Sequence, residues 1–143
     1  MENSNHFNVI VIGAGISGIG AGYYLKKNCP NKSFCIIEGR ENIGGTWDLF
    51  KYPGIRSDSD MFTLGYAFKP WKEQKTIANG PSILSYLEET VEENNLREKI
   101  KFSHKVLSAN WNSAERKWEV RAAYHEQEIL FTANFLFMGT GYY

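Results

Sequence analysis

Residues 9–22 read VIVIGAGISGIGAG, and this stretch decides the fold class. Its first four residues, Val9–Ile12, form a continuous β-branched run that is typical of a strand buried on both faces. Residues 16–28 follow as a predicted helix, which ends before the turn signal CPNK. Residues 33–37 form a second apolar run. A strand, a helix and a strand within about thirty residues predict a βαβ unit with parallel strands.

Three glycines between the first strand and the helix have the spacing G-x-G-x-x-G: Gly13, Gly15 and Gly18. This pattern indicates a dinucleotide-binding loop when it follows a buried strand and opens a helix. The first glycine would allow a tight turn, the second a close approach of a pyrophosphate, and the third close packing of helix on strand. The helix start, with Ile16 and Ser17, would offer free N–H groups to phosphate.

Glu38 ends the second predicted strand, 20 residues after Gly18. A carboxylate at this distance accepts hydrogen bonds from the diol of an adenosine ribose. It also repels a 2′-phosphate, so the loop is predicted to hold FAD or NAD rather than NADP. A glycine-rich turn followed by a surface glutamate is the structural alternative.

The rest of the chain predicts a second helix and several short strands. A helix of about fourteen residues begins at Gly80-Pro81, with Ile83, Leu84, Leu87 and Val91 on one face. Short strands are predicted over 105–111, 118–124 and 128–131, and the apolar run 135–138 is predicted to be a further buried strand. The fold class is therefore α/β, a Rossmann-like FAD-binding domain with a parallel sheet and a small antiparallel β-meander.

The composition of the chain argues against several classes of protein, namely those that bind nucleic acid, span a membrane or hold a metal. The 143 residues contain 16 basic and 16 acidic side chains, which gives no sign of a nucleic-acid or anionic-membrane partner. No apolar stretch reaches the roughly twenty residues of a membrane span. The two cysteines, Cys29 and Cys35, match no common zinc or redox spacing, so no metal site is predicted and a reduced, cytoplasmic setting is the simplest interpretation.

Residues 44–60, GGTWDLFKYPGIRSDSD, read poorly as a helix or a strand. A flavin ring needs a wall of backbone and aromatic surface, and paired glycines let the main chain approach it. The predicted wall of this kind consists of Gly45, Thr46, Trp47, Asp48 and Leu49. Pro53-Gly54 suits a type II turn, which would direct Arg56, Ser57 and Asp58 back toward the same pocket.

At these residues the sequence resembles the class B flavoprotein monooxygenases of the Baeyer–Villiger type. Their fingerprint [A/G]-G-x-W-x-x-x-x-[F/Y]-P-[G/M]-x-x-x-D is filled from Gly44 to Asp58. The likeness extends over essentially the whole chain. It implies a flavin-dependent monooxygenase that binds FAD tightly, uses NADPH and O2, and inserts oxygen into small-molecule ketones or oxidises sulfides.

The resemblance also implies roles for single residues. Val106, in KVLSANW, would meet adenine through its backbone, and Gly139, Thr140 and Gly141, in FLFMGTGYY, would lie near the cofactor. Asp58 would be catalytic, placed at the edge of the flavin to help position an arginine. Arg56 and Ser57 would lie where the nicotinamide cofactor approaches.

Several of these assignments have alternatives. Asp58 and Asp60 could cap a short helix beginning near Met61, an interpretation we favour for Asp60 only. Trp47 could fill a core, and Arg56 could pair with a surface carboxylate. For the chain as a whole, an NAD-linked dehydrogenase module and a non-catalytic nucleotide-binding module are the other hypotheses.

Parts of the family pattern do not occur in these 143 residues. They contain neither a second G-x-G-x-x-G for NADPH nor the fingerprint F-x-G-x-x-x-H-x-x-x-W. The resemblance therefore implies that residues 1–143 form the N-terminal part of a FAD domain, without an NADPH domain or the C-terminal part of the FAD domain, and without turnover by themselves. A missing returning strand would leave an apolar sheet edge and invite self-association.

Overall fold

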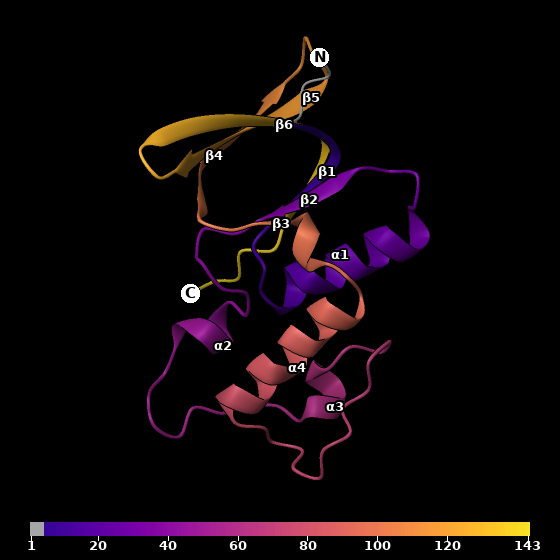
Figure 1. Ribbon diagram of the computed structural model, residues 1–143, viewed down its shortest axis with the longest axis vertical. Coiled ribbons are helices and arrows are strands. Elements are labelled where there is room, and N and C mark those ends of the chain that lie inside the picture. The colour runs from indigo at the N-terminus through magenta and orange to yellow at the C-terminus, as the bar shows by residue number, and fades with distance from the viewer. Residues whose placement is uncertain (1–4) are drawn as a thin grey trace.

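The computed structural model describes residues 5–143, which form one mixed six-stranded sheet with helices. The strand order is β3-β2-β1-β6-β5-β4 (Figure 1). Neighbours among β3, β2, β1 and β6 run parallel, and β6, β5 and β4 form an antiparallel meander. The strand bounds are β1 His6–Ile12, β2 Phe34–Ile37, β3 Ile100–Lys101, β4 His104–Asn112, β5 Lys117–Tyr124 and β6 Gln127–Met138. The predicted Rossmann-like fold and meander are thus confirmed.

The helices α1 and α4 lie on the same side of the sheet (Figure 1). The two longest helices match their predicted spans, α1 Ile16–Asn28 and α4 Gly80–Glu93. The buried side chains of α4 include Ile83, Leu87 and Val91, as its apolar spacing predicts. The short elements are α2 Thr46–Leu49, α3 Met61–Leu64 and the 3-10 helix η1 Arg97–Lys99.

The sheet separates two hydrophobic clusters. On the helix side, Val11 and Ile36 pack with residues of α1 and α4. On the other side, Ile10 and Cys35 pack against the curved meander. Burial raises the pKa of the Cys35 thiol to about 12, although the charge of Lys101 acts in the opposite direction. Cys35 is therefore a core residue, as its place in an apolar strand predicts.

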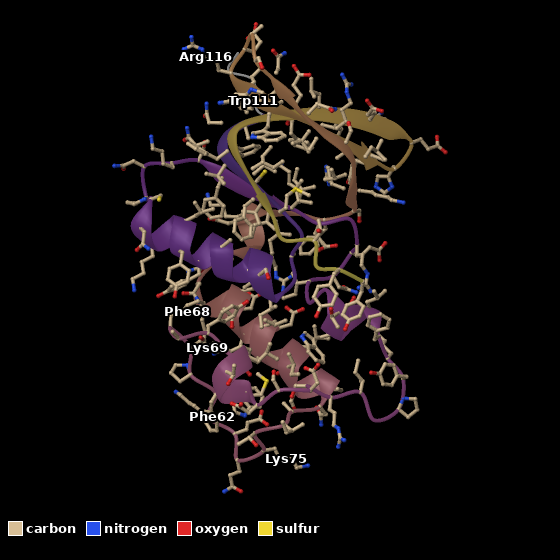
Figure 2. The ribbon with its side chains drawn as sticks, turned by 180° about the vertical axis from the view of Figure 1, so that it is seen from behind. Phe62, Phe68, Lys69, Lys75, Trp111 and Arg116 are labelled. Atoms are coloured by element: carbon tan, nitrogen blue, oxygen red, sulfur yellow. The ribbon has the colours of Figure 1, made fainter. Side chains whose placement is uncertain are left out.

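Aromatic side chains join the segment after α3 to the helices. Phe68 stacks on Tyr23 of α1 with ring centroids 3.5 Å apart, and on Tyr66 at 4.7 Å. The indole of Trp71 is buried and donates a hydrogen bond to the carbonyl of Lys75. In Figure 2, Phe68 lies at the helical end of the molecule and Trp111 lies at the opposite end, on the meander. The aromatic residues of this segment therefore serve packing.

The prediction for residues 128–138 is wrong in two respects. The predicted strands 128–131 and 135–138 are one strand, β6, because the residues between them continue the pairing: Thr132 and Ala133 pair with both β1 and β5. The first half of β6 pairs with β5 and the second half with β1. The second half is also not buried: Phe135 is 69% exposed and Met138 59%, because α1 packs over β1 and β2 instead.

Candidate functional site

A cavity of about 350 Å³ opens where β1, β2 and β6 end. Parallel α/β sheets bind ligands outside the carboxyl ends of their strands, at the point where strand order reverses. Here that point lies between β1 and β6, since β2 and β3 extend the sheet in the other direction. The amide of Gly139 donates to the carbonyl of Ile12 at 2.8 Å, so the two strand ends meet at the cavity.

The glycine loop between β1 and α1 forms the floor of the cavity. Gly13 has φ +98°, and a Cβ atom there would lie 2.4 Å from the carbonyl oxygen of Gly139. A Cβ on Gly18 would lie 1.7 Å from the oxygen of Gly13, which confirms its predicted packing role. No side chain among residues 5–143 caps the start of α1, so its first N–H groups are available to an anion.

Glu38 lies at one end of the cavity, directly after β2. Its side chain is almost buried, with the residue 8% exposed. One carboxylate oxygen accepts from the amide of Ala14 at 2.8 Å, and the other from the amide of Arg40 at 2.9 Å. A carboxylate has about four acceptor positions, so roughly two remain for a ligand hydroxyl pair.

The first glycine pair after Glu38 forms the opposite wall. The amide of Gly44 donates to the carbonyl of Ala14 at 2.9 Å, which holds this turn on the glycine loop. Gly45 has φ +54° and lies so close to Gly15 that a Cβ on Gly45 would be 3.1 Å from the Gly15 Cα. Only glycine combines this backbone conformation with such an approach. Helix α2 starts directly after the turn.

Strand β4 and the end of β6 supply the third wall. The amide of His104 donates to the carbonyl of Glu38 at 2.9 Å, which joins β4 to the end of β2. The register of β4 against β5 shifts between Val106 and Ser108, an irregularity of the kind that re-aims a strand next to a site. The His104 ring stacks on Tyr124 with centroids 4.3 Å apart.

Thirteen of the predicted site residues line this one cavity. They come from the glycine loop, the end of β2, the turn before α2, β4 and the end of β6: Gly13, Gly15, Ile16, Ser17, Glu38, Gly45, Thr46, Trp47, Leu49, Val106, Gly139, Thr140 and Gly141. Residues far apart in the sequence are therefore brought together as the dinucleotide hypothesis requires.

The other five predicted site residues do not line it. Gly18 lies behind the loop, in contact with Gly13. Asp48 is buried, and its carboxylate forms an ion pair with Arg40. The remaining three, Arg56, Ser57 and Asp58, lie in the second half of the 44–60 segment.

That second half turns toward α4. The predicted turn is present, since Gly54 has φ +82° and the amide of Ile55 donates to the carbonyl of Tyr52 at 3.2 Å. The chain then pairs with the start of α4: the Ser57 amide donates to the carbonyl of Ala78 at 2.8 Å, and the Ser57 hydroxyl accepts from the Ala78 amide at 3.1 Å. The turn therefore directs these residues to α4, and the expected return to the pocket is wrong for Ser57, which is buried there.

Asp58 remains near the mouth of the cavity. Tyr143 lines the cavity, and its pKa is raised mainly by the neighbouring Tyr142, with the negative charge of Asp58 acting in the same direction. The exposed Asp58 side chain is thus close enough to act electrostatically on a group at the mouth. Asp60, by contrast, caps α3 by accepting from the Thr63 amide at 3.0 Å, which confirms its predicted role.

Sequence reasoning missed several cavity residues. The most informative are Arg40, His104 and Lys105. Lys105 begins the strand predicted over 105–111 and His104 directly precedes it, so their closeness to Val106 was a signal for both. Arg40 had no such signal, because its partner Asp48 is eight positions away across an irregular loop.

Comparisons with known proteins agree with this geometry. A profile described as an NAD(P)-binding Rossmann-like domain matches residues 11–73. The chain is 52% identical over 140 residues to the FAD-containing monooxygenase EthA of Mycolicibacterium smegmatis, which covers 98% of this chain. The chain is homologous to FAD-containing monooxygenases.

Solved structures extend the likeness to Baeyer–Villiger monooxygenases. An OTEMO complex with FAD and NADP has a TM-score of 0.84 and 30% identity, covering 97% of this chain and 26% of that one. An open structure of cyclohexanone monooxygenase has a TM-score of 0.87 and 28% identity, covering 96% of this chain and 27% of that one. The resemblance to this type of flavin monooxygenase is confirmed.

The match has a defined extent. The chain spans 28% of the length of the EthA relative. Within residues 5–143, none of the helices combines the length and apolar character needed to cross a bilayer.

Proposed function

We propose that this chain binds FAD in the cavity at the ends of β1, β2 and β6. The observation that carries the proposal is a nearly buried carboxylate, Glu38, in the same cavity as the uncapped start of α1 and a wall of close-approaching glycines. A dinucleotide needs this combination: acceptors for a ribose diol, donors for a pyrophosphate, and bare backbone between them. The FAD named in relatives such as EthA and OTEMO supports the choice of cofactor.

The residues present fit this cofactor. Gly13 and Gly45 both line the cavity, and a Cβ atom at either position would collide with the backbone of a neighbouring cavity segment. The ribose would be held by Glu38, the phosphates by the start of α1, and adenine by the backbone at Val106. The flavin end would lie against Thr46–Leu49 and Gly139–Gly141, where Trp47 supplies apolar surface.

For the whole protein we propose an NADPH- and O2-dependent flavin monooxygenase. Bound flavin would supply the redox chemistry that inserts an oxygen atom into a ketone or oxidises a sulfide. The chain's own contribution is to bind FAD and to exclude water along one side of it with Trp47 and Leu49. In this proposal residues 1–143 belong to the first part of the FAD domain. Asp58 and Arg56 act at the cavity mouth, where Asp58 helps to position a charged partner.

We propose a cytoplasmic setting for the protein, on the basis that Cys29 and Cys35 are both free thiols.

We also propose that the isolated chain self-associates through β6. Beyond Ala133, β6 pairs with β1 on one side. The last pair with β5 joins Ala133 to Trp118, near the start of β5, so the other side of residues 134–138 has no strand partner within residues 5–143. The exposed Phe135 and Met138 lie along this stretch. Light scattering over a concentration series tests the proposal, and a strictly monomeric chain at high concentration would contradict it.

Titration of the purified 143-residue chain with FAD tests the central proposal. We expect saturable binding by isothermal titration and a flavin absorbance band that remains with the protein after gel filtration. NAD+ and NADP+ serve as competitors, and NADP+ should bind most weakly because Glu38 repels its 2′-phosphate. Preference for NAD+ over FAD would favour a dehydrogenase module, and binding of neither would overturn the assignment of the cavity.

A further inference from the structure

Arg40 connects several walls of the cavity. Its backbone amide donates to Glu38 Oε1 at 2.9 Å, and its carbonyl accepts from the amide of Ser103, just before β4, at 2.9 Å. Its guanidinium reaches the other way: Nη1 donates to the carbonyl of Gly45 at 3.3 Å, and Nη2 lies 2.7 Å from Asp48 Oδ2. One residue thus joins the end of β2, the start of β4, the glycine turn and α2.

The partner of this guanidinium is a buried charge. The side chain of Asp48 is only 6% exposed, and a buried carboxylate is costly unless a cation neutralises it. Asp48 Oδ2 has no hydrogen-bond partner among residues 5–143. The Arg40 guanidinium, 2.7 Å away, is therefore the group that neutralises the Asp48 carboxylate. The ammonium of Lys51 is 3.8 Å from Oδ1 and far more exposed, so it contributes less.

The contact to Gly45 explains what the ion pair achieves. The Gly45 carbonyl is also the first acceptor of α2, since it receives the amides of Asp48 and Leu49. The turn it belongs to has positive φ at both Gly44 and Gly45, a conformation that loses much backbone entropy when it is fixed. A planar guanidinium bound at two points is suited to holding such a turn in place.

We infer that the Arg40–Asp48 pair is a latch that positions the Gly44–Trp47 wall for a bound flavin. Arg40 is a positioning residue: it acts through the turn and α2, and it holds Trp47 at the cavity. The inference rests on the proposed binding of FAD, but the latch itself is a property of the chain without ligand.

The test compares four chains: wild type, Arg40→Ala, Arg40→Lys and Arg97→Ala. Arg97 is the matched control, because it is an arginine that also pairs with two carboxylates, Glu88 and Glu92, on an exposed surface away from the cavity. Hydrogen exchange of the ligand-free chains reports on the turn, and FAD titration reports on the site. At saturating FAD, residual flavin fluorescence reports whether Trp47 still lies against the ring.

We expect Arg40→Ala to accelerate exchange in peptides covering residues 44–49, to weaken FAD binding about tenfold or more, and to raise residual flavin fluorescence. Arg40→Lys should recover part of each effect, because it keeps the charge beside Asp48 but not the planar fork. Arg97→Ala should match wild type in all three measurements. If Arg40→Ala does not fold, Arg40→Lys and Asp48→Asn carry the same test.

Wild-type exchange over residues 44–49 in a folded Arg40→Ala chain would overturn the latch. If FAD binding of that chain is weaker all the same, Arg40 is a direct ligand instead. Failure of the wild-type chain to bind FAD would overturn the proposed function alone, since the exchange measurement still decides the latch.

Discussion

The two halves of the segment 44–60 have different surroundings, although they form one fingerprint in the sequence. The first half, Gly44–Leu49, forms a wall of the cavity and is tied to the glycine loop through Ala14. The second half, from Ile55 on, pairs with the start of α4 through Ser57 and Ala78. A continuous motif therefore need not be a continuous site.

The difference has a physical cause in the turn that separates the halves. The positive φ of Gly54 reverses the chain after Pro53, and nothing lies within 4 Å of a Cβ placed there. The first half instead has positive φ where the backbone touches Gly15. Glycine serves close approach in one half and chain reversal in the other. The predictions below use this contrast, from the largest expected effect to the smallest.

Replacing Gly45 by alanine should have the largest effect. The new Cβ would lie 3.1 Å from the Gly15 Cα at φ +54°, so we expect about 1–3 kcal/mol of backbone strain and loss of FAD binding. Gly54→Ala is the matched control, with positive φ but open space. It should cost about 1–2 kcal/mol of stability and leave FAD binding unchanged. Urea denaturation and FAD titration of both variants measure this, and equal loss of binding would erase the contrast between the halves.

The second prediction compares the FAD affinities of two variants, one that lacks the carboxylate of Glu38 inside the cavity and one that lacks the carboxylate of Asp58 at its mouth. Glu38→Ala should weaken FAD binding by about 1.5–3 kcal/mol, roughly 10- to 150-fold, because the ribose loses a charged acceptor. Asp58→Ala should leave affinity unchanged, since Asp58 does not line the cavity. Isothermal titration of the two variants decides the matter. Glu38→Gln controls for the amides of Ala14 and Arg40 that Glu38 also accepts, and unchanged affinity of Glu38→Ala would remove the ribose assignment.

Asp58 has a separate test in a longer homologue that carries this segment. If it positions a charged partner at the cavity mouth, Asp58→Ala should spare FAD content and slow flavin reduction by NADPH several-fold. Stopped-flow absorbance measures the reduction rate. A wild-type rate would leave Asp58 as a surface residue of the second half.

The sequence predicts the parts of this molecule that depend on local pattern. The β-branched run at Val9–Ile12 and the glycine spacing specify the end of β1, the loop and α1, although β1 begins three residues earlier, at His6. Strand burial and helix–strand packing act over short distances, so a local pattern is enough here. The cap at Asp60 is likewise a local hydrogen bond. The floor of the site could therefore be predicted in full.

The remaining features depend on contacts between distant segments. The pairing of Arg40 with Asp48 requires an irregular loop to fold back, and no periodicity encodes such a path. The exposure of Phe135 depends on where α1 ends up over the sheet, although its sequence reads as a buried strand. The destination of Ser57 depends on α4, which lies more than twenty residues further along the chain.

The smallest effect concerns Asp60, the second half's helix cap. The Thr63 side chain and the Thr63 amide, in that order, lower the pKa of Asp60 below its ordinary value near 3.8. A carboxylate whose pKa is lower in the folded state adds stability above the unfolded pKa, and this stability is lost as pH falls through the folded pKa. Asp60→Ala should therefore lower the melting temperature slightly at pH 6, and the difference in melting temperature from wild type should narrow as pH falls from 5 to 3.

Asp58→Ala, which removes an exposed carboxylate two positions away, is the control and should show a smaller difference at pH 6. Thermal melts of the three chains across this range measure the effect. An Asp60 gap that stays constant with pH would show that the carboxylate charge does not contribute to the cap.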